Sequence, residues 1–302
     1  MLVCPACRGA LYPKAESLAC RVCGASYGEN EQGYLEFLVR AGGAEEESDR
    51  LEAYAGHQEA SAGRFEREFL GPYVAGEPGS RVLDAGCGAG RTVSLLRAGG
   101  REAYGVDLPK AARFWARRGE GTGHLFCADV TSLPFADGFF DVVMSLGVIE
   151  HVGTLVGHCT LAPDFGEQRR RYARELVRVT RTGGRILVSC PNKSFPVDVH
   201  HGPQDAVSRP SPVRSAVFGA TGLNLHRTWG DYHLVSYREI RRLFCEQAGA
   251  RGMRAIPVSG YFAYGSLGNR ALCRLARVYV QRLPSSLRAS PLNPFVLAEI
   301  RR

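Results

Sequence analysis

The sequence predicts a layered α/β fold, a mainly parallel β-sheet flanked by helices, preceded by a small cysteine-bearing module. From about Leu51 onward, short apolar runs of strand type alternate with segments of helical periodicity, which is typical of α/β domains. The run FDVVMS at 140–145 is apolar enough for a strand buried on both faces of a parallel sheet. Before Leu51 the chain is instead turn-rich, and it carries a close cluster of cysteines.

The expected elements follow one another in α/β order. Apolar runs predict seven strands, over 79–85, 103–107, 125–127, 140–145, 185–189, 253–258 and 295–300. Helical periodicity predicts helices over 64–74, 91–98, 110–118, 169–179 and 236–248. It also predicts an amphipathic helix over 265–283 that packs on the domain or meets an anionic or lipid-linked substrate; its apolar face consists of Leu267, Ala271, Leu272, Leu275 and Val278. Thr182, Gly183 and Gly184 are predicted to stop the helix before them. Residues 191–231 are predicted to be irregular.

Composition limits the class of protein. The chain is 45% hydrophobic and 23% charged, as in an ordinary globular protein. Residues 1–10 lack the features of a secretory signal, and no uncharged apolar stretch approaches the roughly 18 residues of a membrane span. We therefore expect a cytoplasmic protein without a transmembrane segment. The net charge of +8 is concentrated in the arginine-rich tail, which allows an anionic substrate, nucleic acid or lipid, or simply a solvated helix face.

Cysteines near the start of the chain have the spacing of a zinc site. Cys4 and Cys7 form one C-x-x-C pair, and Cys20 and Cys23 form a second after a short spacer. Two such knuckles allow four thiolates to converge tetrahedrally on Zn²⁺, which stabilises a module too small for a large core. A redox dithiol or two coincidental pairs are the alternatives. Four sulfur ligands leave no open position, so the predicted zinc is structural.

A glycine turn follows the first predicted strand of the α/β region. The segment VLDAGCGAG has the spacing D-x-G-x-G-x-G, which differs from the G-x-G-x-x-G of dinucleotide sites. It resembles the first motif of class I S-adenosylmethionine-dependent methyltransferases. That resemblance implies a Rossmann-like seven-stranded methyltransferase sheet with S-adenosylmethionine as cofactor. It also assigns cofactor contacts along this region, namely Asp84, Gly86, Gly88, Gly90, Asp107, Leu108, Asp129, Val130 and Ser145.

Within this resemblance the residues have distinct expected roles. Asp84 helps to hold the methionine amino group, and the glycines let the main chain approach the cofactor. Asp107 accepts hydrogen bonds from both ribose hydroxyls at the end of its strand. Asp129 and the N–H of Val130 read the adenine edge.

The acceptor side is predicted from the residues after the fourth strand. Glu150 and His151 resemble the acid–histidine pair of small-molecule methyltransferases, so His151 is the candidate general base and Glu150 a candidate substrate contact. Gly147 stands where some quinone O-methyltransferases have a metal-binding acid, which argues against metal-assisted catalysis. His200 and His201, in a polar histidine-bearing stretch, are further candidate substrate contacts. Asp198, His200 and His201 are also candidate ligands or bases, and a hydrogen-bonded turn is the alternative for each of them.

The predicted organisation is a zinc ribbon at 1–39, a linker at 40–50 and a class I methyltransferase domain at 51–302 with an insertion at about 191–232. The expected function is methyl transfer to a small metabolite, natural product or glycan intermediate. One alternative is an rRNA guanine methyltransferase that uses its ribbon for RNA, although the ribbon is near neutral. Another is a non-catalytic S-adenosylmethionine-binding interaction protein.

Overall fold

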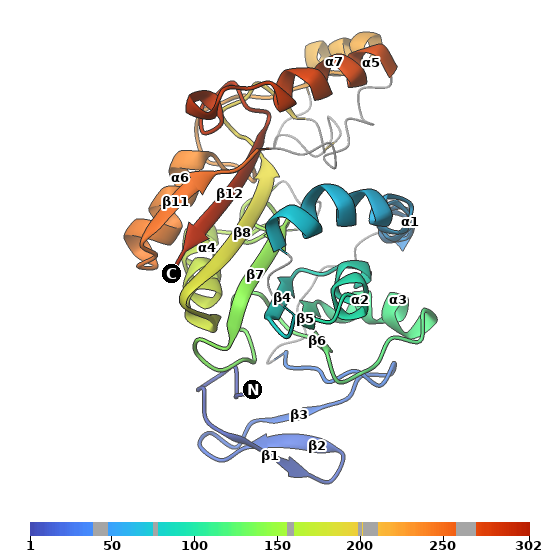
Figure 1. Cartoon of the computed structure of the whole chain (residues 1–302), viewed down its shortest axis with the longest axis vertical. Helices are drawn as coiled ribbons and strands as arrows, with labels where there is room; N and C mark the ends of the chain where they lie inside the picture. Colours follow the sequence, from blue (N-terminus) through green and yellow to red (C-terminus); the bar gives the residue numbers. More distant parts are fainter. Residues whose placement is uncertain (39–47, 75–77, 156–159, 199–200, 202–210, 258–269) are drawn as a thin grey trace. The chain divides into compact units, whose positions relative to one another are not determined.

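The computed structural model describes residues 1–38, 48–74, 78–155, 160–198, 201, 211–257 and 270–302 (Figure 1). The chain divides into two compact units. Unit 1 comprises Met1–Ser145, Arg171–Ile186 and Arg301–Arg302. Unit 2 comprises Leu146–Arg170 and Leu187–Ile300.

The N-terminal module is a small antiparallel sheet. Its strands are β1 (Leu11–Lys14), β2 (Ser17–Cys20) and β3 (Ser26–Gly28), in the order β1-β2-β3. Lys14 pairs with Ser17, so only two residues turn the chain, and Ala15 has a left-handed φ of 49° there. The buried rings of Tyr27 and Phe37, whose centroids are 5.2 Å apart, form part of the small core of this region.

A long helical segment precedes the central sheet. It consists of α1 (Ser48–Phe65) and the π-helical η1 (Glu66–Val74), so it begins well before the helix predicted at 64–74. Phe69, Leu70 and Val74 are buried within η1. The early start was missed because residues 48–63 are mostly small or polar and show little apolar periodicity.

The central elements of unit 1 follow the prediction closely. They are β4 (Arg81–Ala85), α2 (Arg91–Ala98), β5 (Glu102–Asp107), η2 (Pro109–Ala111), α3 (Ala112–Arg117), β6 (Leu125–Cys127) and β7 (Phe140–Leu146). β4 pairs in parallel with both β5 and β7, and β5 pairs in parallel with β6. Val82, Leu83 and Val143 are fully buried, as expected for strands covered on both faces.

One predicted helix stop is wrong. Helix α4 (Phe165–Val179) ends at Val179, and β8 (Thr180–Pro191) begins at once and contains Thr182, Gly183 and Gly184. Glycine is required in this strand for space, because a Cβ on Gly184 would lie 2.9 Å from the carbonyl oxygen of Asp141. Gly184 therefore allows close packing within the strand instead of terminating the helix.

Unit 2 has more regular structure than the sequence indicated. The stretch expected to be irregular contains β9 (Val197–Asp198), α5 (Pro212–Thr221) and β10 (Asn224–Leu225), and β9 pairs antiparallel with β10. The following elements are α6 (Tyr237–Arg241), η3 (Arg242–Gln247), β11 (Gly252–Ala255), α7 (Arg270–Gln281), η5 (Ser285–Leu287) and β12 (Phe295–Arg301). Ser236 and Glu239 form a capping box at the start of α6, which fixes its first residue.

Seven strands form one sheet in the order β11-β12-β8-β7-β4-β5-β6 (Figure 1). This order confirms the Rossmann-like seven-stranded prediction. On the predicted apolar face of α7, Leu275 and Val278 are 66% and 47% exposed, whereas Val280 near the end of the helix is buried. Apolar periodicity alone does not reveal whether a partner covers such a face.

Candidate functional site

The glycine turn between β4 and α2 has a left-handed main chain. Gly86, Gly88 and Gly90 have φ of 90°, 53° and 75°, a region that costs other residues roughly 1–2 kcal/mol each. The N–H of Gly86 donates to the carbonyl of Val106 at 2.8 Å, which fastens the turn to β5. The alternate glycines of the D-x-G-x-G-x-G motif thus occupy the positions where the main chain is left-handed.

Asp107 ends β5 beside this turn. Its Oδ2 accepts from the N–H of Gly88 at 2.7 Å, and its Oδ1 accepts from the N–H of Leu108 at 2.8 Å. The carboxylate is half-buried, whereas Leu108 is 38% exposed. Both carboxylate oxygens are therefore oriented by main-chain donors at the carboxyl end of the strand, where open α/β sheets bind ligands.

Trp115 supports the turn and was not identified from the sequence. Its indole Nε1 donates to the carbonyl of Gly88 at 2.8 Å, and a Cβ on Gly90 would lie 3.1 Å from its ring. Gln58 of α1 adds a third support, because its Oε1 accepts from the N–H of Ala89 at 2.9 Å. The sequence shows only that a tryptophan lies in the helix after β5, and no motif links it to the glycine turn.

Asp84 lies at the base of the turn and is buried. Burial, and then the negative charge of Asp107, raises the pKa of Asp84 to about 7, and a hydrogen bond from Thr92 opposes this shift. A carboxyl group with this pKa changes its charge near neutral pH. A nearby cation would favour its ionised form.

The remaining predicted cofactor residues take different positions in unit 1. Asp129 is exposed, and its Oδ1 accepts from the N–H of Thr131 at 2.7 Å, while Val130 is half-buried beside it. Ser145 is fully buried and donates from Oγ to the carbonyl of Ala85 at 2.7 Å. In this structure the Ser145 hydroxyl therefore joins the ends of β7 and β4.

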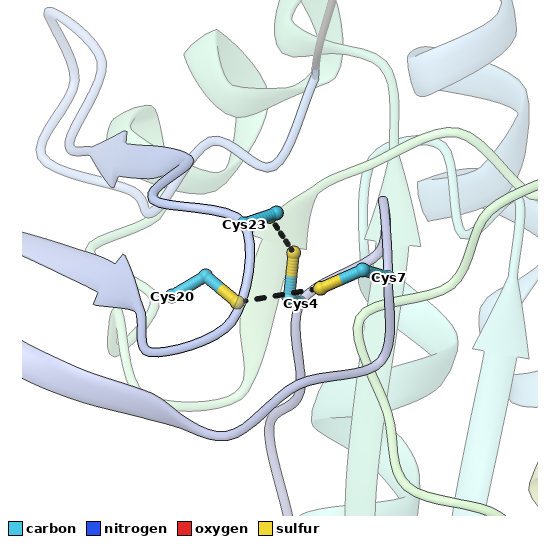
Figure 2. Close-up of side chains that lie close together, drawn as sticks. All are labelled: Cys4, Cys7, Cys20 and Cys23. Atoms are coloured by element: carbon cyan, nitrogen blue, oxygen red, sulfur yellow. Dashed lines mark hydrogen bonds between the residues drawn. The ribbon is translucent and has the colours of Figure 1, made fainter.

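The four N-terminal cysteines converge on one point (Figure 2). Their sulfur atoms all lie within 4.8 Å of one another. The Cys4–Cys23 and Cys7–Cys20 sulfur distances are 3.6 and 3.4 Å. A tetrahedron with Zn–S bonds of about 2.3 Å has sulfur–sulfur edges of about 3.8 Å, so the arrangement fits one zinc ion.

The backbone around the cysteines also suits bound thiolates. Hydrogen bonds from the N–H groups of Cys23 and Val22 lower the pKa of the Cys20 thiol to about 6. Gly9 is needed for space, because a Cβ there would lie 2.9 Å from the Cys20 sulfur. Main-chain hydrogen bonds and the space at Gly9 therefore both accommodate the Cys20 sulfur atom. A redox dithiol does not require this arrangement.

The N-terminal module is joined to the rest of unit 1 by hydrogen bonds that the sequence did not reveal. The N–H of Val3 donates to Pro134 at 3.0 Å, and the N–H of Phe37 donates to the carbonyl of Cys127 in β6 at 2.7 Å. The Tyr34 ring packs edge-on against Trp115 with centroids 5.1 Å apart. Trp115 thus contacts both the module and the glycine turn.

Polar side chains of unit 2 form a separate cluster. Ligand atoms of Glu150, His151 and His201 lie within 4.8 Å of one another. Glu150 is 2% exposed, and burial raises the pKa of its carboxyl group to about 7 although the charge of His201 opposes this shift. The structure therefore brings together three of the predicted acceptor-side residues. The fourth, His200, lies outside the described residues.

Asp198, a candidate ligand or base from the sequence, and His233, which had no individually predicted role, extend this cluster. The ring of His201 is hydrogen-bonded to the carboxylate of Asp198, with 2.9 Å between His201 Nδ1 and Asp198 Oδ2. His233 is fully buried with its ring centroid 5.1 Å from that of His201, and burial lowers the pKa of His233 to about 3. The histidines of this stretch are visible in the sequence, but their convergence depends on the β9–β10 pairing.

Part of the chain is similar to known proteins. Residues 83–188 match the family model described as a methyltransferase domain. An Encephalitozoon cuniculi protein named as a methyltransferase is 38% identical over 122 residues, or 40% of this chain and 49% of that protein. A Mycobacterium tuberculosis protein named as a probable S-adenosylmethionine-dependent methyltransferase is 31% identical over 112 residues, or 37% of this chain and 36% of that protein.

Similarity extends to solved structures at lower identity. A SAM-dependent methyltransferase from Archaeoglobus fulgidus has a TM-score of 0.45 and 16% identity, with 85% of this chain and 100% of that chain covered. The chain spans about half or less of the length of the two sequence relatives. The matched region contains the glycine turn, Asp107 and the Glu150–His151 pair. Among the helices of the described residues, none is long and apolar enough to cross a membrane.

Proposed function

We propose that this chain is an S-adenosylmethionine-dependent methyltransferase that acts on a small metabolite, natural product or glycan intermediate. The observation that carries the proposal is the left-handed glycine turn, with Gly88 hydrogen-bonded to the carboxylate of Asp107 at 2.7 Å. The methyltransferase-domain match over 83–188 and the name of the M. tuberculosis relative support the same cofactor.

The residues present fit this cofactor. Main chain at Gly86 and Gly88 has no side chain to exclude a ligand, and Asp107 offers oxygens to the two ribose hydroxyls. Asp84 supplies a buried carboxyl group that a methionine ammonium would ionise. Asp129, Val130, Leu108 and Ser145 complete the proposed cofactor residues. When bound, the sulfonium cofactor supplies an electrophilic methyl group.

On the acceptor side, we assign His151 as the general base. It follows β7 along the chain, after a turn in which its N–H donates to the carbonyl of Val148 at 2.9 Å. Removal of a proton from the acceptor by an imidazole typically contributes about 10²–10⁴-fold to a rate. Glu150, His200 and His201 are proposed substrate contacts.

The zinc ion at Cys4, Cys7, Cys20 and Cys23 has a structural role in this proposal. Four sulfurs leave no position for a reactant. The module contacts Trp115 through Tyr34, and Trp115 in turn donates to Gly88. We infer that the ribbon braces the cofactor turn.

A small acceptor is favoured over RNA because few basic groups of the ribbon are available. Residues 1–39 carry Arg8, Lys14 and Arg21 against four glutamates, and Arg8 pairs with Glu175 at 3.3 Å. Binding to RNA normally needs a basic surface with several phosphate contacts. The rRNA methyltransferase and the non-catalytic binding protein remain as outcomes of the test below.

The test uses full-length protein, cofactor with a labelled methyl group, and host extract separated into small-molecule, RNA and protein fractions. We expect label in the small-molecule fraction with wild type and none with Asp107→Ala. Glu16→Gln, which alters an exposed acid in the β1–β2 turn, serves as the matched control and should retain labelling. Label in RNA would support the rRNA alternative, and cofactor binding without label anywhere would support the non-catalytic one.

A further inference from the structure

Three potential metal ligands meet in unit 2, far along the sequence from the cysteines. Ligand atoms of Asp198, His201 and His233 lie within 4.8 Å of one another. Two imidazoles and one carboxylate are a donor set used by catalytic zinc and non-haem iron sites. The 2.9 Å between His201 Nδ1 and Asp198 Oδ2 approaches the edge of roughly 3–3.5 Å expected for two ligands of one ion.

His233 supplies an independent observation that points to a ligand. Its side chain is fully buried, and neither ring nitrogen has a hydrogen-bond partner among the described residues. Buried polar groups are nearly always satisfied, and one left unpaired costs about 1–3 kcal/mol. An ion bound to one of these nitrogens would satisfy that nitrogen.

The surrounding contacts hold the three residues in place. Asn224 of β10 pairs with Asp198 of β9, and its side-chain nitrogen donates to the carbonyl of His201 at 2.6 Å. Arg169 of α4 donates to the carbonyl of His233 at 2.7 Å. The main chain at His201 and at His233 is therefore held by hydrogen bonds, as preorganised metal ligands require.

We propose that Asp198, His201 and His233 form a second metal site, which binds a divalent transition-metal ion. Gly147, whose identity argued against a metal after β7, has no part in this ligand set. The neighbouring set of Glu150, His151 and His201 shares one histidine with it. We favour the set with His233 because that residue lacks any other polar partner for both ring nitrogens among the described residues.

Three protein ligands leave at least one coordination position open. An acceptor oxygen could occupy that position, a role that rests on the proposed function. Ion binding itself does not depend on methyl transfer, so it is measured without cofactor.

The test is calorimetric titration of Co²⁺ into untagged full-length protein whose cysteines already hold zinc. We expect one Co²⁺ per chain, without the thiolate-to-cobalt absorption that displacement at the cysteines would produce. His233→Ala and Asp198→Asn should each weaken binding at least tenfold. His57→Ala, which removes an exposed histidine of α1, is the matched control and should bind as wild type does.

Two further measurements keep the test decisive. Binding of S-adenosylhomocysteine should be unchanged in His233→Ala, so loss of Co²⁺ alone would separate this site from the cofactor site and from misfolding. In wild-type protein, Co²⁺ should shift and broaden the NMR signals of the His201 and His233 rings, whereas diamagnetic Zn²⁺ should shift them without the broadening. The proposal is overturned if wild type binds no Co²⁺, or if Glu150→Gln and His151→Ala abolish binding while His233→Ala retains it.

Discussion

The two candidate sites of this protein differ in how the chain assembles them. In unit 1, the glycine turn and Asp107 come from one continuous β-α-β segment, and main-chain hydrogen bonds connect them. In unit 2, the polar cluster collects residues from the turn after β7, from β9 and its vicinity, and from the segment before α6. The first kind of site can be read from spacing along the sequence. The second becomes visible only when the chain is folded.

The stability of the two sites should differ in the same way. The unit 1 site depends on a turn braced by Trp115, and through Tyr34 by the zinc module. The unit 2 cluster is braced by Arg169 and Asn224, which lie in the same unit. Disturbance of the ribbon should therefore reach the cofactor turn first. The predictions below test this contrast, starting with the largest expected effect.

Removal of one zinc ligand should have the largest effect. Cys20→Ser should lose one zinc per chain and the hydrogen-exchange protection of residues 1–37, because structural zinc contributes about 10–16 kcal/mol in small modules. Cofactor affinity should also fall, since Tyr34 no longer supports Trp115. Elemental analysis and hydrogen exchange measure these changes, with Cys245→Ser, a half-buried thiol outside the cluster, as control. Unchanged protection of the ribbon would contradict the structural role of zinc.

Gly90→Ala should weaken cofactor binding about tenfold or more. The new Cβ would meet the Trp115 ring at 3.1 Å and would also be strained at a φ of 75°. Gly100→Ala is the matched control, because Gly100 has a φ of 78° but no atom within 4 Å of its Cβ position. Both variants should lose roughly 1–2 kcal/mol of stability, but only the first should lose cofactor affinity. Equal affinities by calorimetry would argue against a cofactor site at this turn.

The pKa of Asp84 predicts opposite pH trends for stability and binding. Its folded-state pKa of about 7 exceeds the unfolded value of about 3.8, so its stabilising contribution is complete below the unfolded pKa and is lost as pH rises through 7. Cofactor binding, which uses the ionised carboxylate, should weaken below pH 7 by up to about tenfold per unit. Asp84→Asn should flatten both profiles between pH 5.5 and 8.5, in thermal melts and calorimetry. A wild-type affinity independent of pH would remove the assigned role of Asp84.

Trp115→Phe should give the smallest effect. It removes the hydrogen bond from the indole to Gly88 while keeping an aromatic ring, so the loss is about 1 kcal/mol, or roughly fivefold in cofactor affinity. Trp229→Phe, at a side chain that is 71% exposed, provides the comparison. If both variants bind the cofactor equally well, the hydrogen bond from Trp115 to Gly88 does not contribute to cofactor binding.

Sequence reasoning reached the fold and the unit 1 turn because both depend on local signals. α2 and β6 have the predicted bounds, since glycines or apolar runs mark their ends. Local signals do not predict features that depend on tertiary contacts. Gly184 lies in a strand where the main chain of Asp141 passes close by, and Leu275 is exposed although its spacing is that of a packed helix. Asp198 and His233 gave no motif, because their approach depends on the β9–β10 pairing and on Arg169.

The central claim is that the turn at Gly86–Gly90 and Asp107 bind S-adenosylmethionine, and equilibrium dialysis with labelled cofactor tests it most directly. We predict one bound cofactor per wild-type chain, no displacement by excess NADH, and an affinity lower by about 100-fold or more in Asp107→Ala, since two hydrogen bonds to a charged group contribute about 1.5–3 kcal/mol each. The account is contradicted if Asp107→Ala binds as tightly as wild type, or if NADH displaces the labelled cofactor.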